Sequence, residues 1–198
     1  GLPNTNVLGL MPAWADGCFG VKAISVYHDN AAHGFPSHQG LILLFESDHG
    51  SLLAGVDATS VTKIRTGAVS AAASRILARP ESENLCILGC GAQGASHLEA
   101  LTLSFPIKKV TLWDARPEAA QALSVSFADQ AKDRGFEIKA CETAEEAVRE
   151  ADIICTVTPS KEPVLKGSWL KPGAHINAVG ACAPDARELD SDAVAMSS

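Results

Sequence analysis

The stretch CILGCGAQGASHLEAL, residues 86–101, constrains the fold of this chain more than any other. An apolar, strand-forming run leads into three glycines spaced G-x-G-x-x-G, and a helix-forming run follows them. Gly89 permits a tight turn, Gly91 admits a phosphate close to the backbone, and Gly94 lets the helix pack close to the strand. The next strand-like run ends in Asp114, 20 residues after Gly94. Strand, turn, helix and acidic strand end in this order predict a dinucleotide-binding unit.

Strand-like and helix-like runs alternate along the chain from residue 85 onward. We predict strands at 85–89, 108–114, 136–141, 152–158 and 174–180, and helices at 92–104, 117–135 and 143–151. Strict alternation with short connections is typical of a parallel sheet with right-handed crossovers. The predicted fold class is therefore α/β, with a Rossmann-type doubly wound sheet.

The first 80 residues follow a different pattern. Strands are predicted at 20–27, 41–47 and 51–58, and the turn signal DHG between the last two predicts a hairpin. An Ala-rich helix is predicted at 59–79, with Thr59 or Ser60 as its N-cap and with an apolar face formed by Val61, Ile64, Ala68, Ala71 and Leu77. The polar, Pro-led run PESEN at 80–84 predicts a domain boundary.

The glycine turn and the helix after it define the expected cofactor site. A helix that opens at Ala92 directs its first N–H groups and its positive dipole end toward bound phosphates. We therefore expect the dinucleotide to contact Gly89, Gly91, Ala92, Gln93 and Gly94.

Two charged residues bear on which dinucleotide binds. A carboxylate at Asp114 accepts hydrogen bonds from the ribose hydroxyls and repels a 2′-phosphate, which favours NAD(H). Arg116 is suited to hold a 2′-phosphate instead, so NADP(H) remains the alternative. The carboxyl ends of parallel strands line the cofactor crevice of such sheets, which adds further candidate contacts at Thr156, Thr158, Asn177 and Val179.

Composition and charge exclude several other classes of protein. The formal net charge is −7 and no basic run stands out, so nucleic acid is not an expected partner. No apolar stretch reaches the roughly 20 residues that span a bilayer, and no signal-peptide pattern opens the chain. Cys86, Cys141 and Cys155 fall in apolar, strand-like runs, which favours buried free thiols and a cytoplasmic location. The sequence begins with glycine and ends inside a helix-like run, so we expect a fragment of a longer protein.

Histidines recur at every fifth position, at His28, His33 and His38. That spacing does not place metal ligands on one helix face, and no Cys-x-x-Cys pair accompanies it. We therefore expect no metal site.

Several longer runs carry a resemblance to one family. MPAW, FPSHQGLILLFES, DATSVTKIRTGAVSA, ILGCGAQGASH and PGAHINAVGACAPDARELD resemble the ornithine cyclodeaminase/mu-crystallin family, over Gly9 to Asp190. The likeness is strongest to the mu-crystallin branch, whose members are similar to ketimine reductases. The resemblance implies NAD(P)H-dependent reduction of a small cyclic imino acid, such as Δ1-pyrroline-2-carboxylate or Δ1-piperideine-2-carboxylate. It also implies a homodimer.

The resemblance further implies a role for each half of the chain. Residues 1–80 correspond to part of a substrate-binding and dimerisation domain. Residues 81–198 correspond to the dinucleotide-binding domain, incomplete at its C-terminal end. The imino acid is expected in the cleft between the two domains.

Three residues take substrate roles from the resemblance. Lys22 matches the active-site lysine of the family, Arg65 matches the arginine that binds the substrate carboxylate, and His38 matches a residue at the cofactor and substrate cleft. A guanidinium is the natural clamp for a planar carboxylate. Lys22 lies within an apolar strand, so burial near a second cation should lower its pKa and permit proton exchange.

The chain departs from the family pattern at one position. Ornithine cyclodeaminases and the alanine dehydrogenase carry an acid/base aspartate where this chain has Cys182, and mu-crystallin-type proteins also lack it. A thiol does not readily replace that carboxylate, so imine reduction is favoured. Asp185, three residues later, is a candidate substitute, although we expect it to be an ordinary loop acid. An ornithine cyclodeaminase or alanine dehydrogenase-like enzyme and a non-enzymatic, NADP-dependent binder of thyroid-hormone-like molecules remain alternatives.

Overall fold

The structure is a computed structural model that describes residues 6–197, except for the side chains of residues 28 and 31. The side chain of His28, one of the three spaced histidines, therefore lies outside the described residues. The chain divides into two units, Gly1–Arg65 and Thr66–Ser198, here called unit 1 and unit 2. The division falls inside a helix, before the domain boundary expected at 80–84. Residues 80–84 are a turn that leads into a strand.

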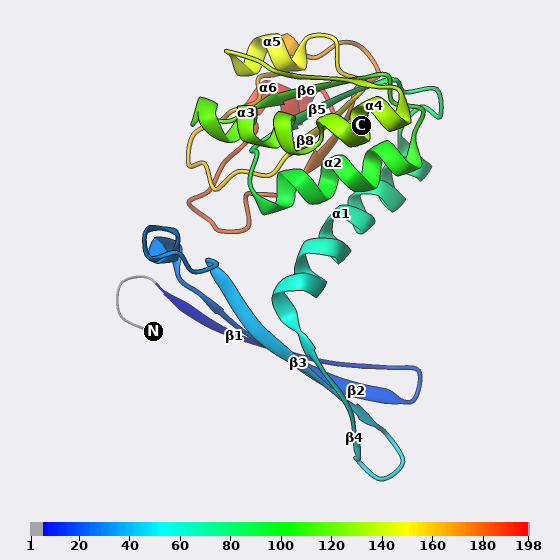
Figure 1. Cartoon of the computed structure of the whole chain (residues 1–198), viewed down its shortest axis with the longest axis vertical. Helices are drawn as coiled ribbons and strands as arrows, with labels where there is room; N and C mark the ends of the chain where they lie inside the picture. Colours follow the sequence, from blue (N-terminus) through cyan, green and yellow to red (C-terminus); the bar gives the residue numbers. More distant parts are fainter. Residues whose placement is uncertain (1–5, 198) are drawn as a thin grey trace. The chain divides into compact units, whose positions relative to one another are not determined.

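Unit 1 is an antiparallel sheet of four strands in chain order (Figure 1). Its strands are β1 (Val7–Ala15), β2 (Cys18–Val26), β3 (His38–Glu46) and β4 (Leu52–Asp57), and the 3-10 helix η2 (His28–His33) follows β2. The predicted hairpin of β3 and β4 is confirmed. Sequence patterns missed β1, because Gly9 and Pro12 weaken a strand signal, and β1 tolerates the proline as an edge strand.

Helix α1 (Ala58–Leu77) leads from unit 1 into unit 2 and differs from its prediction in two ways. It starts before the expected caps, since the carboxylate of Asp57 accepts the N–H of Ser60 at 2.6 Å and caps the first turn. The expected apolar face is wrong at Ile64, Ala68 and Leu77, which are exposed.

Small residues, and not the apolar ones, make the close packing of α1. A Cβ at Gly67 would lie 2.6 Å from the carbonyl oxygen of Ser96 on the next helix, and Ser70 and Ser74 are buried. Ala71 of the expected face is buried, but apolar periodicity ignores glycine and serine and so missed Gly67, Ser70 and Ser74.

Unit 2 is a parallel sheet of five strands in the order β7-β6-β5-β8-β9, which confirms the α/β prediction. The strands are β5 (Asn84–Leu88), β6 (Lys109–Trp113), β7 (Glu137–Ala140), β8 (Ile153–Thr156) and β9 (His175–Ala178). The helices are α2 (Ala92–Ser104), α3 (Pro117–Ser126), α4 (Ala128–Arg134), α5 (Ala144–Val148) and α6 (Ser191–Ala195), with the 3-10 helix η3 (Gly167–Trp169). None of the helices in the described part of the chain is long and apolar enough to cross a membrane.

The single helix predicted at 117–135 is two helices in the structure. The break is at Phe127, whose backbone leaves the helical region at φ −104° and ψ 2° while its ring is buried. Burial of this ring in the core outweighs the continuity of the helix. Gly135 ends α4 in the left-handed conformation at φ 75°, as predicted.

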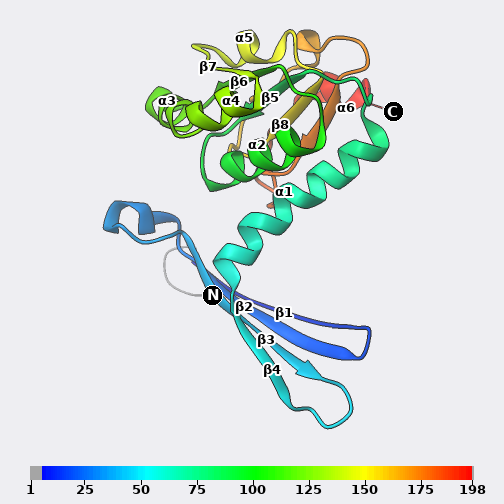
Figure 2. The ribbon, with the colours of Figure 1, turned by 45° about the vertical axis from the view of Figure 1, so that its right-hand side comes forward.

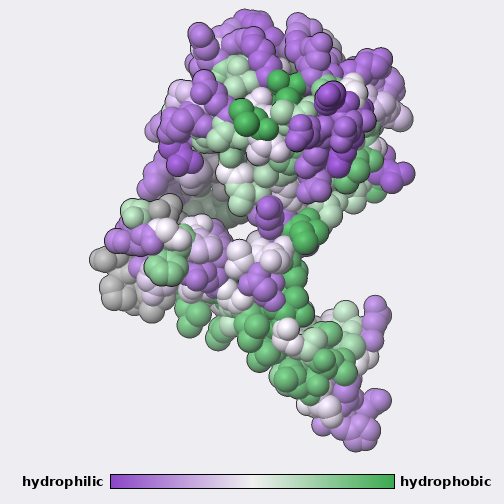
Figure 3. Space-filling model, viewed as in Figure 1, coloured by the Kyte–Doolittle hydropathy of each residue, from purple (hydrophilic) through white to green (hydrophobic). Residues whose placement is uncertain are grey.

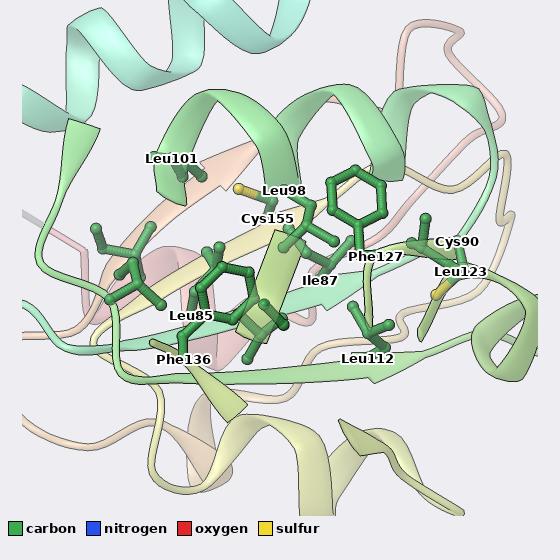
Figure 4. Close-up of a cluster of buried hydrophobic side chains, with 14 of the residues drawn as sticks. Leu85, Ile87, Cys90, Leu98, Leu101, Leu112, Leu123, Phe127, Phe136 and Cys155 are labelled. Atoms are coloured by element: carbon green, nitrogen blue, oxygen red, sulfur yellow. The ribbon is translucent and has the colours of Figure 1, made fainter. Parts of the chain in front are cut away.

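The sheet of unit 2 has a core on each face. Leu85 and Ile87 of β5 pack with α2, α3 and α4, whereas Cys86 and Leu88 pack with α5 on the other face. Figure 2 shows these helices on the two sides of the sheet. Figure 4 shows the first of these cores, with Leu98 of α2 directed toward the strands. Successive residues of a strand point to opposite faces of the sheet, and both faces carry a buried core. This is why these strands appear in the sequence as continuous apolar runs. Cys86, Cys141 and Cys155 are buried free thiols, as expected.

Candidate functional site

The glycine turn joins β5 to α2, and each glycine meets a different demand. Gly89 has φ 105°, and a Cβ there would lie 2.9 Å from both Thr158 Cγ2 and the carbonyl oxygen of Val157. A Cβ at Gly94 would lie 2.2 Å from the carbonyl oxygen of Gly89, so α2 packs directly on the turn. At Gly91 an added Cβ meets nothing within 4 Å, so packing inside the described chain does not require this glycine. Close approach of a ligand to the backbone would require it.

The N-terminus of α2 is open in the way that an anion site needs. Gly91 is its N-cap and makes no side-chain capping bond, so the helix begins with the N–H groups of Ala92, Gln93 and Gly94. The first N–H groups of a helix have no intrahelical partner, and the helix dipole adds positive potential there. The predicted phosphate-binding residues are therefore brought together in a geometry that fits the pyrophosphate of a dinucleotide.

Asp114 directly follows β6 and lies against the glycine turn. Its carboxylate accepts the N–H of Cys90 at 2.8 Å and the N–H of Arg116 at 2.9 Å. The Arg116 guanidinium Nε lies 3.6 Å from the same carboxylate, and its side chain is 70% exposed against 13% for Asp114. The carboxylate is thus fixed beside the turn, while the arginine is free to reorient. This arrangement leaves both NAD(H) and NADP(H) open.

The four predicted residues from the ends of β8 and β9 lie at the carboxyl edge of the sheet, and the structure gives most of them partners within the chain. The side chain of Thr156 is fully buried. The backbone carbonyl of Thr156 accepts the N–H of Val179 at 2.9 Å. The Asn177 amide donates to Ser74 Oγ at 2.9 Å, which supplies the partner that a buried amide needs. Cofactor contacts by Thr156, Thr158, Asn177 and Val179 stay predictions.

A buried acid, Glu188, was missed by the sequence patterns. Its carboxylate bonds to Thr156 and Thr158, which precede it by about 30 residues, and the side chain is 1% exposed. A glutamate in a polar loop carries no local signal of such burial, because its partners come from other strand ends.

Lys22 lies on β2, between Met11 of β1 and Ile42 of β3. Its ammonium donates to Thr62 Oγ1 at 2.7 Å. Burial lowers the pKa of Lys22, and the positive charge of Arg65 lowers it further, which confirms the direction expected from the sequence. Thr62 is a second residue that the sequence patterns missed, since a lone threonine in a helix has no signal of its own.

Arg65 is exposed and lies three residues after Thr62 on α1, so the two share a helix face. Within the described residues, no carboxylate forms an ion pair with Lys22 or Arg65. Lys22 also lines a shallow hollow of about 250 Å³ on the sheet, whose other walls are largely apolar, among them Met11, Ile42 and Leu44. Lys22 borders this apolar surface, and the charge of Arg65 acts on Lys22, which suits binding of a small organic acid.

His38, the third residue of the predicted substrate site, begins β3 and is exposed. Its Nδ1 lies 2.9 Å from Ser37 Oγ, and its carbonyl accepts the hydroxyl of Thr59. It precedes Ile42, the neighbour of Lys22, by four residues, which is about 13 Å along a strand. The structure therefore places His38 in unit 1 without bringing it against Lys22.

Cys182 and Asp185 lie in the segment after β9. Cys182 is exposed, and its thiol contacts the carbonyl of Val179 at 3.2 Å. Asp185 pairs with Lys161 at 2.7 Å, and this hydrogen bond and charge hold the pKa of the Asp185 carboxyl below its usual value. Asp185 is thus engaged in an exposed ion pair, which is typical of a loop acid.

Comparison with known proteins identifies the family to which this chain belongs. The sequence pattern of the ornithine cyclodeaminase/mu-crystallin family matches residues 3–198. The ketimine reductase mu-crystallin of Rattus norvegicus is 44% identical over 187 residues, which cover 93% of this chain and 58% of that protein.

Solved structures agree with this similarity. An archaeal alanine dehydrogenase dimer with bound NAD has a TM-score of 0.86 and 38% identity, covering 94% of this chain and 57% of that one. The Δ1-pyrroline-2-carboxylate reductase of Thermococcus litoralis, in complex with NADH and L-proline, has a TM-score of 0.82 and 34% identity, covering 96% and 63%. The chain thus spans less than two thirds of the length of these relatives.

Proposed function

Since the chain belongs to the ornithine cyclodeaminase/mu-crystallin family, we propose that the protein reduces small cyclic imino acids with NAD(P)H. The substrate class includes Δ1-pyrroline-2-carboxylate and Δ1-piperideine-2-carboxylate, and the products are the cyclic amino acids. The observation that carries the proposal is the pair of cations in unit 1, Lys22 and Arg65, without a carboxylate partner among the described residues. The similarity to a ketimine reductase and to a Δ1-pyrroline-2-carboxylate reductase supports it.

The residues of unit 1 would bind and orient the imino acid. Arg65 presents a planar guanidinium, which clamps a carboxylate through two parallel hydrogen bonds. Lys22 adds a second positive charge, and Thr62 fixes its ammonium at 2.7 Å. Because burial and Arg65 lower the pKa of Lys22, this lysine can exchange a proton near neutral pH more readily than an exposed lysine.

The residues of unit 2 would hold the dinucleotide. The N–H groups that open α2 would bind the pyrophosphate, and Asp114, which accepts the Cys90 N–H beside the glycine turn, would bind the adenosine ribose. When bound, the nicotinamide supplies the hydride that reduces the C=N carbon. NAD(H) is the proposed cofactor and NADP(H) the alternative, since Arg116 is free to leave Asp114 for a 2′-phosphate.

The exposed cysteine after β9 bears on the reaction class. Imine reduction requires a hydride and one proton, whereas deamination of an amino acid also requires an acid/base group for the water step. Cys182 occupies the position of the family aspartate, and Asp185 is engaged by Lys161. These two observations favour imine reduction over cyclodeamination.

Turnover tests the proposal directly. The protein is mixed with NADH or NADPH and each cyclic ketimine, and nicotinamide absorbance is followed. We expect Arg65→Met to raise the KM for the ketimine by about tenfold to a hundredfold, since it removes charged hydrogen bonds. Arg75→Met, an exposed arginine on the same helix, is the matched control and should leave KM unchanged.

The absence of substrate-dependent oxidation with either cofactor would overturn the reductase proposal. Binding of NADPH without any turnover would instead favour a small-molecule binding protein of the mu-crystallin type.

A second candidate is an alanine dehydrogenase-like activity, because the archaeal alanine dehydrogenase is structurally similar at a TM-score of 0.86. NAD reduction in the presence of L-alanine, with ammonia release, would favour it. Ammonia release from L-ornithine would favour a cyclodeaminase and would contradict the argument from Cys182.

We also propose that the protein is a homodimer that pairs through the sheet of unit 1. By strand register, one face of this sheet carries Leu8, Leu10, Trp14, Phe19, Leu41 and Leu52, all exposed, and we call it the apolar face. Figure 3 shows hydrophobic residues gathered over this sheet, while hydrophilic residues dominate the visible surface of unit 2. Exposed apolar patches of this kind mark association surfaces, and the similar alanine dehydrogenase is a dimer.

A further inference from the structure

Glu188 is a buried carboxylate whose hydrogen-bond partners all come from one edge of the unit 2 sheet. Its side chain is 1% exposed. Burying a carboxylate is costly unless hydrogen bonds replace its water. A buried carboxylate of this kind is therefore expected to hold the groups around it in place through its hydrogen bonds.

Five neutral donors satisfy this carboxylate. Oε1 accepts the N–H of Thr158 at 2.6 Å and the Thr158 hydroxyl at 2.7 Å. Oε2 accepts the Thr156 hydroxyl at 2.9 Å, the N–H of Gly180 at 2.7 Å and the N–H of Ala181 at 3.1 Å. One side chain thus joins the end of β8 to the segment that follows β9.

These strand ends lie at the carboxyl edge of the sheet, where α/β folds bind dinucleotides. They also touch the glycine turn, because Thr158 Cγ2 is an atom that a Cβ at Gly89 would approach to 2.9 Å. Glu188 therefore holds two segments of backbone directly, one at Thr158 and one at Gly180 and Ala181, and the first of them packs against the glycine turn.

We infer that Glu188 is a positioning residue for the dinucleotide site, which it preorganises by clamping Thr158 and the backbone at Gly180 and Ala181. This inference rests on the proposed function, since it requires a dinucleotide at the glycine turn. Glu188 itself is buried beneath these segments and acts through them. Sites of this kind lose affinity when the groups that orient their walls are removed.

Only a carboxylate can satisfy both sides of this arrangement. In Glu188→Gln, the amide NH2 must take the place of one oxygen. At Oε1 it would face the N–H of Thr158, and at Oε2 it would face the N–H groups of Gly180 and Ala181. Each orientation sets donor against donor, while side-chain volume stays nearly the same.

The test compares Glu188→Gln with Asp152→Asn in the full chain. Asp152 is a matched control because it is also a buried carboxylate of unit 2 and accepts backbone N–H groups, from Glu83 and Asn84. Asp152 directly precedes β8, whereas Thr156 is the last residue of β8, so the two lie at opposite ends of this strand. Calorimetry measures the Kd for NADH and for NADPH at a temperature well below the unfolding temperature of the less stable variant. Steady-state kinetics measures the KM for the dinucleotide and the KM for the imino acid.

Both variants should lower the unfolding temperature, but only Glu188→Gln should weaken dinucleotide binding, by about tenfold to a hundredfold. The KM for the imino acid should stay unchanged, since its carboxylate is assigned to unit 1. Amide hydrogen exchange should speed up at Gly180 and Ala181 in Glu188→Gln and not in Asp152→Asn.

Two failures are distinguishable. Absence of NADH and NADPH binding by the unaltered protein would overturn the proposed function. Binding by the unaltered protein together with an equal Kd for Glu188→Gln would overturn the role of Glu188 alone, as would an equal loss of affinity in Asp152→Asn.

A milder pair of variants covers the case in which Glu188→Gln does not fold. Thr156→Val removes one buried hydroxyl donor to Glu188, and Thr156→Ser keeps it. The valine variant should bind NADH about threefold to tenfold more weakly, and the serine variant should restore binding. Equal affinities for valine, serine and threonine at this position would contradict the inference.

Discussion

The two units of the chain bury their apolar residues to very different extents. Unit 2 packs leucine, isoleucine and phenylalanine side chains on both faces of its parallel sheet. In the described part of unit 1, the buried hydrophobic side chains are Ile24 and Ala58, while six large apolar residues of the apolar face are exposed. Unit 2 therefore has a core of its own, whereas unit 1 leaves large apolar side chains exposed, as the proposed dimer would require.

The difference also separates two kinds of site. The proposed dinucleotide-binding groups of unit 2 are mostly backbone N–H groups and short side chains, next to a buried core. The proposed substrate-binding groups of unit 1 are long cationic side chains on a half-buried sheet and a helix. Such side chains need local hydrogen bonds to be oriented, and Thr62 supplies one to Lys22.

The largest expected effect is on the core of unit 2. Leu98→Ala should lower the free energy of unfolding by about 2–5 kcal/mol, because Leu98 is fully buried and truncation leaves a cavity. Urea denaturation followed by circular dichroism measures the change. Val125→Ala, at an exposed position of α3, should change it by less than about 0.5 kcal/mol. Equal losses in the two variants would contradict the assignment of Leu98 to the core that stabilises unit 2.

A charge on the apolar face of unit 1 should act on association. Leu10→Glu places a carboxylate at an exposed position of this face and should weaken the dimer by at least about 2 kcal/mol. Light scattering coupled to size exclusion measures the mass as the protein is diluted. Val125→Glu, on unit 2, should leave the mass unchanged. A Leu10→Glu protein that stays dimeric would place the interface elsewhere.

Loss of the Thr62 hydroxyl should change the chemistry of unit 1 without changing the core of unit 2. In Thr62→Val the Lys22 ammonium loses its acceptor, so its pKa falls further below the usual value. Activity that requires the charged lysine is lost as pH rises through this pKa, so the alkaline limb of kcat/KM should move to lower pH. The kcat/KM itself should fall by about tenfold. Thr62→Ser keeps the acceptor and should match the unaltered protein; identical pH profiles for valine and serine would exclude this role.

The smallest effect concerns His97, which lies fully buried between Ser70 and the carbonyl of Gln93. Burial lowers the pKa of His97, and the bond to the Gln93 carbonyl only partly opposes it. Below the ordinary histidine pKa of about 6.5, the unfolded chain binds a proton at His97 and the folded protein does not. The free energy of unfolding therefore decreases as pH falls below this value. Urea midpoints at mildly acidic and neutral pH should differ less in His97→Gln than in the unaltered protein. An unchanged difference would assign the pH dependence to other groups.

The sequence predicted the parts of the fold in which one local signal dominates. Helix α2 has its predicted bounds, and the glycine turn and the alternation of unit 2 are confirmed. Local signals failed where tertiary contacts decide, as at Phe127, which breaks a helix to bury its ring, and at Gly67, which lets two helices touch. Edge strand β1 was hidden by Pro12, and Glu188 was hidden because its partners are distant in sequence.

The buried thiols have a practical consequence. Burial raises the pKa of Cys90 and of Cys155 to about 12, so almost none of either thiol is ionised at neutral pH. Alkylating dyes attack the ionised form and need access, and Cys182 is exposed. A fluorophore attached there would sit two residues from Gly180, whose N–H the Glu188 carboxylate accepts, so a change in its emission on addition of NADH alone would be a direct readout of the proposed site.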